Sequence, residues 1–505
     1  MNLALAVTTA LLLALLFPPY NVPMLAPVAL APLLYASMRE GSWRRRLLMG
    51  EVAGTAYWLL HCYWINEVLA THGGLAGPVG WFTLLLFAAL KGVHMAVFAT
   101  LAGWLMESRW AILSVPALWV GLERTHGEFG FQWLLLGNAA MEMSVPLRLA
   151  PLVGVYGVSF VLAMLGTGLA LAVLRRPRLE LAPLALLVLL YAAPPLPPVA
   201  PPRQQAAVMQ PNVPQDARWD DASFKRLVER VFRSSASAAL DVTQPKPDLI
   251  LWPESPAPFF FDSDAAFAEA ARGLARSTRT YFLFGAIAYT PKQEQLNAAL
   301  MLGPGGEELS RYAKMYLVPF GEFVPPIFFW INKITKEAGD STPGTRIEVP
   351  RVDGHGVGGF ICYESAFPEL VRRFTDQGSE LLINLTNDGY FGRTGARQQH
   401  LLLARMRAVE NGRWLLRPTN DGYTVSIDPT GRIREQLPPF EAATGRLHFS
   451  WIAEKTPYTR YGAWFPWLCL LFGTGLALTR IGNSDPDGFV SKPTNPEPST
   501  SRKLR

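Results

Sequence analysis

The class of fold follows from one uncharged stretch, residues 149–174, which reads LAPLVGVYGVSFVLAMLGTGLALAVL and is followed directly by two arginines. Its length exceeds the roughly 20 apolar residues that an α-helix needs to cross a bilayer. A second apolar stretch, residues 461–479, is bounded by an arginine on each side. We therefore expect a membrane protein in which one span lies far along the chain from the others.

The composition excludes several other classes of protein. Of 505 residues, 50% are hydrophobic and only 17% are charged, whereas an ordinary soluble domain has about 25% charged residues. The three cysteines, Cys62, Cys362 and Cys469, are too few and too scattered for a disulfide framework or a cysteine metal site. We expect neither a metal nor another cofactor.

Residues 1–38 carry no charge, and the prolines at positions 18, 19 and 23 predict two short helices joined by a turn. A cleaved signal peptide is the alternative, but no positive charge precedes the apolar residues. The further apolar stretches are 47–68, 78–105, 110–123, 149–174, 179–196 and 461–479. Together they predict about eight spans. Lys91 and His61 fall within expected spans, where polar groups are suspected of a function, but the sequence assigns them none.

The orientation of these spans follows from the cations in the short loops, because Lys and Arg are retained on the cytoplasmic side. One set of loops holds Arg39, Arg44, Arg45, Arg46, Arg109, Arg175, Arg176 and Arg178. The opposite loops hold only Arg124 and Arg148. We therefore expect the N-terminus in the cytoplasm and residues 203–460 in the periplasm or on the cell exterior. This asymmetry accounts for the net charge of +6 without a nucleic-acid partner.

The region after residue 200 has a different character, with charges throughout and short β-type runs between amphipathic helical patterns. This alternation predicts an α/β domain in which helices cover β-sheet. The expected strands are 205–210, 249–252, 281–288, 298–302, 357–362, 381–385 and 424–428, and the expected helices are 224–239, 265–276 and 398–411. The expected division is a transmembrane domain of about seven helices over 1–200, a periplasmic catalytic domain over 201–455, a transmembrane helix over 456–482 and a disordered cytoplasmic tail over 483–505.

Three side chains in the α/β region can carry chemistry. Cys362 ends an apolar strand-like run and can act as a nucleophile. Glu254, just beyond another strand, can act as a general base, and Lys314 can stabilise an oxyanion. Taken singly, each has a plainer interpretation as a buried cysteine, a solvated carboxylate or a snorkelling lysine. Their shared position at strand ends favours a common site.

The segments around these residues resemble the motifs of a known family. Leu251-Trp252-Pro253-Glu254, Lys314 with the following 317–325, and Cys362-Tyr363-Glu364 are similar to the Glu, Lys and Cys motifs of the nitrilase superfamily. More narrowly, they resemble the apolipoprotein N-acyltransferase family of the bacterial inner membrane. Further similar segments are 116–119, 154–160, 384–392, 399–400, 405–413 and 419–422. Tyr390 departs from the family, which often has Trp there.

The resemblance implies a polytopic α-helical membrane domain joined to a nitrilase-like αββα sandwich. It makes Cys362 the nucleophile, Glu254 the general base and Lys314 the oxyanion stabiliser. Glu322 and Glu364 would support this triad, and Tyr363 would lie beside the nucleophile. Trp219 would line the substrate pocket.

The implied reaction is N-acylation of the S-diacylglyceryl-cysteine at the N-terminus of an apolipoprotein, through a thioester on the cysteine. The partners would be a phospholipid acyl donor, the diacylated apolipoprotein acceptor and membrane lipids, with the protein acting as a monomer. An alternative is a membrane-tethered amidase that uses the same triad but passes the acyl group to water. From another class, the chain could be a transporter or sensor whose outer domain only binds ligand.

Overall fold

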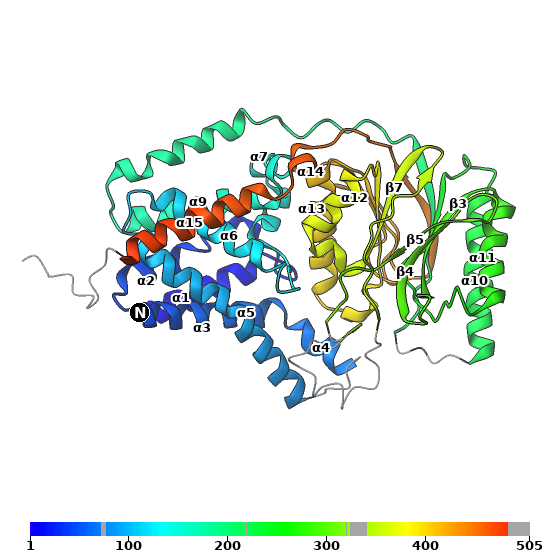
Figure 1. Ribbon diagram of the computed structural model, residues 1–505, viewed down its shortest axis with the longest axis horizontal. Helices are drawn as coiled ribbons and strands as arrows, with labels where there is room; N and C mark the ends of the chain where they lie inside the picture. The colour runs from blue at the N-terminus through cyan, green and yellow to red at the C-terminus, as the bar shows by residue number, and fades with distance from the viewer. Residues whose placement is uncertain (72–76, 216, 218–219, 320, 324–340, 483–505) are drawn as a thin grey trace, which may run out of the picture.

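The computed structural model describes residues 1–71, 77–215, 217, 220–319, 321–323 and 341–482. Two parts lie side by side in Figure 1, a helical bundle coloured blue to cyan and an α/β part coloured green to orange. The red helix α15 (Trp464–Gly482) returns from the α/β part to the bundle. Two expectations, the pocket residue Trp219 and the disordered tail over 483–505, lie outside the described residues.

The bundle begins as the prolines predict. The expected pair of short helices is present as α1 (Asn2–Leu15) and α2 (Ala31–Arg39). The helices that follow are α3 (Trp43–His61), α4 (Trp64–Thr71), α5 (Pro78–Leu105), α6 (Ala111–Thr125) and α9 (Val155–Val173), with the one-turn helices α7 (Ser144–Leu147) and α8 (Ala150–Val153) before α9.

Glycines allow α3 and α5 to approach closely. A β-carbon at Gly50 would lie 2.5 Å from the backbone oxygen of Met95, and one at Gly54 would lie 2.7 Å from Cα of Gly92. Small residues four apart on one helix face are a common contact between membrane helices, because they bring the two backbones together. The contact holds together the centre of the bundle.

Three helices within the described residues are long and apolar enough to cross a bilayer, namely α5, α9 and α15. The expectation of eight spans is therefore not confirmed. The helices α1, α2 and α6 have 14, 9 and 15 residues, and α3 carries three arginines and a glutamate along its 19 residues. The apolar content of the sequence shows where the expected spans lie. Prolines and charged residues within them limit the length of each regular apolar helix.

The last segment expected to span before the α/β part also differs from the expectation. Residues 178–191 form a 3₁₀ helix with no buried residue. The side chain of Arg148 donates to the backbone oxygens of Tyr191 and Ala193, both at 3.3 Å. From there the chain runs over the top of the molecule to β1 (Figure 1).

The α/β part contains two six-stranded sheets within the described residues. The first has the order β12-β1-β2-β3-β4-β5, formed by Ala443–Phe449, Gln204–Gln210, Leu249–Leu251, Tyr281–Tyr289, Gln295–Leu302 and Glu308–Ala313. The second has the order β11-β10-β9-β8-β7-β6, formed by Ile433–Gln436, Val425–Ile427, Leu415–Arg417, Leu381–Leu385, His355–Ile361 and Arg351–Val352. All seven expected strands are present, and β5, β6, β9, β11 and β12 are additional.

Helices cover both sheets, which gives the expected αββα layering (Figure 1). On the outer side, α10 (Asp221–Ala239) and α11 (Ala265–Thr278) pack apolar faces on the first sheet. The side chains of Asp220 and Asp264 cap them by accepting from backbone N–H groups at 2.6 and 3.0 Å. On the inner side, α12 (Pro368–Asp376) and α13 (Ala396–Asn411) lie between the second sheet and the bundle.

The strand directions bring several strand ends together. In the first sheet β2 pairs in parallel with β1 and β3, and in the second sheet β8 pairs in parallel with β7 and β9. The carboxyl ends of parallel strands share one edge of a sheet. The segments that follow β2, β5, β7 and β8 therefore meet at a common end of the sandwich.

One buried side chain on α13 joins the sandwich to the bundle. The Gln399 amide oxygen accepts from the indole nitrogens of Trp64 and Trp133 at 3.1 and 2.7 Å. Its amide nitrogen donates to the backbone oxygens of Pro18 and His61 at 2.7 and 3.2 Å. A single amide thus satisfies four buried polar groups from four different segments of the bundle.

We expect Gln399→Leu to lower the free energy of unfolding by about 3 kcal/mol or more, because each buried polar group left without a partner costs roughly 1–3 kcal/mol. Thermal unfolding of the detergent-solubilised protein, followed by tryptophan fluorescence, measures the change. Gln398→Leu is the matched control, since Gln398 is exposed. Equal melting temperatures for the two variants would contradict this account of the interface.

Candidate active site

The structure brings the three sequence-predicted side chains together in one buried site. The Lys314 ammonium lies 3.1 Å from Oε1 of Glu254 and 2.9 Å from the Glu322 carboxylate. The Cys362 thiol lies close enough to the Glu254 carboxylate for its negative charge to raise the pKa of the thiol, after burial. Lys314, Cys362 and Glu254 are only 1, 4 and 5% exposed. A thiol, a carboxylate and an ammonium therefore share one water-poor environment.

The nucleophile candidate occupies a strained turn. Strand β7 ends at Ile361, and Cys362 begins a 3₁₀ turn, Cys362–Ala366, rather than ending the strand as expected. Its φ of +51° lies in the left-handed region, which costs a non-glycine residue about 1–2 kcal/mol. Such conformations persist only where surrounding contacts impose them, and they cluster at functional sites.

Both oxygens of Glu254 are held by donors from other strands. Oε1 accepts from the Asn297 side-chain amide on β4 at 2.9 Å and from Lys314. Oε2 accepts from the backbone N–H of Asn387, just beyond β8, at 3.0 Å. Gly285 on β3 leaves room for the backbone at Glu254, because a β-carbon at Gly285 would lie 2.7 Å from Cα of Glu254. These contacts fix the carboxylate beside the thiol.

Lys314 directly follows β5 and remains an ammonium despite its burial. Burial alone would lower its pKa, but the carboxylates of Glu254 and Glu322 raise it well above the usual value. Asn297 also donates to Glu322 at 2.7 Å, and the backbone N–H of Val318 donates to it at 2.8 Å. The site therefore holds a fixed positive charge beside Cys362.

The thiol itself is held in its neutral form. Burial and the negative charge of Glu254 raise the pKa of Cys362 well above the ordinary thiol value, and the ammonium of Lys314 only partly opposes them. The resting arrangement is therefore a protonated thiol with a carboxylate as acceptor. Deprotonation must accompany attack, which is the situation that requires a general base.

Glu364 joins the two loops that carry Cys362 and Lys314. Its Oε1 accepts from the Tyr312 hydroxyl at 2.6 Å and from the backbone N–H of Met315 at 2.7 Å. Its Oε2 accepts from the backbone N–H of Ile361 at 2.7 Å. Burial raises the pKa of Glu364 to about 7, while these donors favour its carboxylate. Glu364 therefore holds the loop of Cys362 against the loop of Lys314.

Tyr363 connects the nucleophile turn to the bundle. Its hydroxyl donates to the backbone oxygen of Gly130 at 2.8 Å. Its ring stacks on Trp133 with centroids 6.2 Å apart and lies 6.2 Å from Phe131. The residue after Cys362 therefore rests on a loop of the helical bundle.

Sequence reasoning missed several residues at the site. Asn297 and Asn387 hold Glu254. Partial burial and then the nearby Glu254 carboxylate raise the pKa of Tyr390, which the sequence marked only as a departure from the family. The signal for Asn297 was a lone amide within the apolar run 296–302. Tyr390 is 42% exposed, which places it at the mouth of the site.

Of the two polar residues expected within spans, Lys91 has hydrogen-bond partners in the bundle, whereas Nε2 of His61 has none among the described residues. The Lys91 ammonium lies 2.6 Å from Nδ1 of His126 and donates to the backbone oxygen of Phe131 at 2.9 Å. The His61 ring stacks on Tyr57, and its backbone oxygen accepts from Gln399. Lys91 therefore anchors the loop on which Tyr363 rests.

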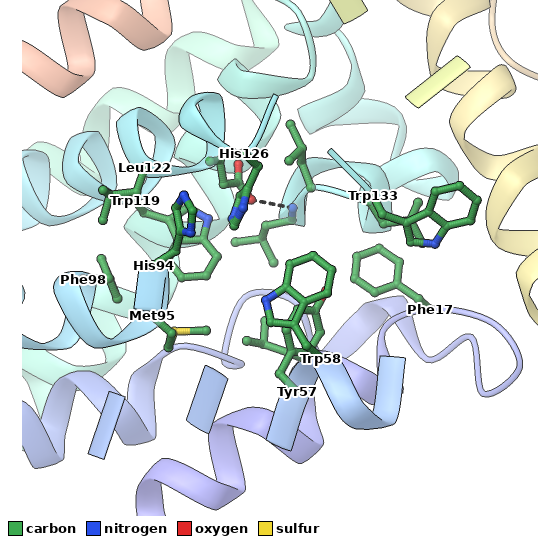
Figure 2. A pocket seen from close by; sticks show the side chains of 15 residues that line it. Phe17, Tyr57, Trp58, His94, Met95, Phe98, Trp119, Leu122, His126 and Trp133 are labelled. Atoms are coloured by element: carbon green, nitrogen blue, oxygen red, sulfur yellow. Dashed lines mark hydrogen bonds between the residues drawn. The ribbon is translucent and has the colours of Figure 1, made fainter. Parts of the chain in front are cut away.

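A cavity of about 50 Å³ lies beside this loop, within the bundle. Figure 2 shows it lined mainly by aromatic rings, including Trp58 and Trp119, with Trp133 at the end nearest the α/β part. The Glu123 carboxylate accepts from the backbone N–H of Leu136 at 2.7 Å, drawn as a dashed line. Trp133 lines the cavity and also stacks on Tyr363, the residue after Cys362.

Two family models divide the chain as the structure does. The apolipoprotein N-acyltransferase N-terminal domain matches residues 9–168, and the carbon-nitrogen hydrolase domain matches residues 205–448. An apolipoprotein N-acyltransferase from Geobacter metallireducens is 35% identical over 489 residues, covering 92% of each chain. One from Pseudomonas putida is 32% identical, covering 95% of this chain and 97% of the relative.

Two solved structures are similar to about half of the chain. An amidase from Nesterenkonia sp. AN1 is 20% identical, with a TM-score of 0.39, and covers 51% of this chain and 96% of its own. Nit3 of Saccharomyces cerevisiae, a member of the nitrilase superfamily, is 17% identical with a TM-score of 0.39 and covers 49% and 90%.

We expect alkylation of Cys362 by iodoacetamide to be slow at pH 8 and to keep rising above pH 9, because a raised pKa shifts the thiolate to higher pH. Glu254→Gln removes the anion that raises this pKa and leaves the Lys314 cation. Its alkylation at pH 8 should therefore be faster, by roughly tenfold for each unit that the pKa falls. Site-resolved mass spectrometry measures the rates, with Cys62 and Cys469 as internal references. Slower alkylation in Glu254→Gln would contradict the assignment of Glu254 as an anion that raises the pKa of Cys362.

Proposed function

This chain belongs to the apolipoprotein N-acyltransferase family, and from that premise we propose that it moves an acyl chain from a phospholipid to an apolipoprotein. The acceptor is the α-amino group of an N-terminal S-diacylglyceryl-cysteine. One observation carries the proposal: a buried thiol lies beside a carboxylate, and that carboxylate is paired with a buried ammonium. This set supplies a nucleophile, a base and a stabiliser of negative charge.

In the first half-reaction, Glu254 takes the thiol proton while the Cys362 sulfur attacks the ester carbonyl carbon. The ammonium of Lys314 and the backbone N–H of Tyr363 stabilise the oxyanion that forms. The ester carbon–oxygen bond then breaks, and Glu254 returns the proton to the glycerol oxygen. A lysophospholipid leaves, and a thioester remains on Cys362.

In the second half-reaction, the α-amine of the acceptor attacks the thioester carbonyl, and Glu254 takes its proton. An amino terminus has an unperturbed pKa near 8, so a useful fraction is uncharged at neutral pH. The carbon–sulfur bond breaks, the thiol recovers a proton and the amide product leaves. All proton transfers use Glu254, so the ping-pong route calls for no cofactor.

The remaining site residues support this triad. Glu322 shares the charge of Lys314 with Glu254, which keeps the ammonium in place when Glu254 becomes protonated. Glu364 holds the nucleophile turn against the lysine loop. Trp219 is proposed to line the substrate pocket on the family resemblance.

The membrane half suits substrates that are embedded in lipid. Drawing an acyl chain into water costs about 0.8 kcal/mol for each CH₂ group, and a catalytic domain anchored at the bilayer avoids this cost. We infer a monomer in the bacterial inner membrane whose eight apolar segments cross or enter the bilayer. The catalytic domain would face the periplasm, and its tail the cytoplasm.

We expect full-length protein, mixed with a phospholipid and no acceptor, to carry a hydroxylamine-sensitive acyl group on Cys362. Adding a synthetic diacylated lipopeptide should discharge the group and yield the triacylated peptide. Cys362→Ala should lose both reactions while keeping its melting temperature. Intact mass spectrometry measures the adduct and the product.

Two results would favour other functions. Release of free fatty acid without triacylated peptide would support the membrane-tethered hydrolase. An unacylated Cys362 that can be replaced by Ala without loss of function in cells would support a binding protein.

The proposed orientation predicts the behaviour of reporter fusions. Green fluorescent protein fused after residue 505 should fluoresce, because it folds in the cytoplasm. Alkaline phosphatase fused after residue 203 should be active, because it folds in the periplasm. Both expectations rest on the excess of arginines in the loops assigned to the cytoplasmic side. The reverse pattern in whole cells would refute the orientation.

A further inference from the structure

A second buried polar cluster lies directly behind the nucleophile. His400 on α13 places Nε2 at 2.9 Å from the backbone oxygen of Cys362. Its Nδ1 lies 2.9 Å from Oδ1 of Asp388, and Arg417 places Nη2 at 3.0 Å from both Asp388 oxygens. All three side chains are fully buried. The mechanism described above does not use this cluster.

The partner of Nε2 decides which atom carries the proton. A backbone carbonyl oxygen can only accept a hydrogen bond, so Nε2 of His400 must be the donor. Asp388 and Arg417 act on the opposite ring nitrogen, since Nδ1 lies 2.9 Å from the carboxylate and 3.0 Å from the guanidinium. The pair therefore holds the ring in place whether or not Nδ1 also carries a proton.

The acceptor is the carbonyl of a strained residue. Cys362 has a φ of +51°, and its carbonyl also receives the side-chain amide of Asn384 at 3.3 Å. Two donors from α13 and β8 thus hold the peptide group that joins Cys362 to Tyr363. These are contacts of the kind that keep a residue in a costly backbone conformation.

The same peptide group carries the N–H of Tyr363. A hydrogen bond to the carbonyl of a peptide polarises the whole group and makes its N–H a stronger donor. In the proposed reaction that N–H faces the developing oxyanion. The contact from His400 therefore acts on both the nucleophile and the oxyanion site through one peptide group.

We propose that His400, held by Asp388 and Arg417, is a positioning residue for acyl transfer. Its Nε2–H fixes the Cys362–Tyr363 peptide, keeps the thiol in its reactive turn and strengthens the oxyanion donor. This role rests on the proposed function. It predicts a larger effect on the acylation step, which needs both the turn and the oxyanion donor, than on substrate binding or on alkylation of the thiol, which needs no oxyanion donor.

The test compares variants of the full-length protein in detergent, with a phospholipid that carries an alkyne-tagged acyl chain. His400→Leu removes the donor, whereas His400→Gln can place an amide N–H near the position of Nε2. Leu403→Ala, at a buried position of the same helix, is the control for loss of stability. The readouts are the single-turnover rate of Cys362 acylation, its dependence on phospholipid concentration, the rate of iodoacetamide alkylation and the melting temperature.

We expect His400→Leu to lower the maximal acylation rate about 100-fold, the loss typical of one oxyanion donor, with less than about a threefold change in half-saturating phospholipid. Alkylation, which develops no oxyanion, should change less than about threefold, and His400→Gln should recover at least about tenfold of the lost rate. If His400→Leu does not fold, two other variants are compared. The acylation rate of His400→Gln must then be about tenfold higher than that of His400→Asn, because the shorter Asn amide cannot reach the carbonyl.

Three outcomes would overturn the inference. Acylation by His400→Leu within about threefold of the unmodified protein would show that the contact is dispensable. A parallel loss of acylation in Leu403→Ala at the same melting temperature would show that His400 has a merely structural role. Equal acylation rates of His400→Gln and His400→Asn would show the same. If the unmodified protein forms no acyl-enzyme, the proposed function itself fails. Such a result is distinct from the three outcomes above, which concern only the role of His400.

Discussion

The arrangement of the catalytic half depends on one buried charge, the ammonium of Lys314. A lone ion in a protein interior is very costly, and a buried pair is tolerated only when good geometry and further hydrogen bonds satisfy both partners. Here two carboxylates, Glu254 and Glu322, share the ammonium, and donors such as Asn297 and the backbone of Asn387 occupy their other positions. Because these groups come from four different segments, the sandwich must close correctly before the charge is compensated.

The features that the sequence predicted are those encoded in short stretches. Apolar runs such as 381–385 and 249–252 stand out locally, so the strands that end at the site, and the placement of Cys362 and Glu254 beyond them, could be read in advance. Strand β12 could not, because it pairs with β1 from more than 230 residues away, and half-exposed β5 has no apolar alternation. The predicted number of spans is not confirmed, because hydropathy reports burial in lipid or in protein alike. The contacts of Asn297 with Glu254 and of His400 with Cys362 could not be predicted, because they join residues that come together only in the folded chain.

The two halves of the molecule are joined through polar contacts as well as apolar packing. Gln399 satisfies four groups of the bundle, and Glu410 accepts from the backbone N–H of Val155 at the start of α9 at 2.8 Å. Tyr363 meets Gly130 in a loop that Lys91 anchors. Polar contacts of this kind require particular partners at particular positions, so they set the orientation of the sandwich on the bundle more strictly than apolar contacts do.

Two of these contacts come from consecutive residues of one helix. On α13, Gln399 reaches the bundle while His400 reaches the carbonyl of Cys362. A rotation or shift of this rigid helix that disrupts one contact must disturb the other. A newly made chain whose halves have not yet joined would therefore carry a poorly supported nucleophile and remain inert. Under the proposed function, assembly and competence for chemistry would therefore be reached in the same step.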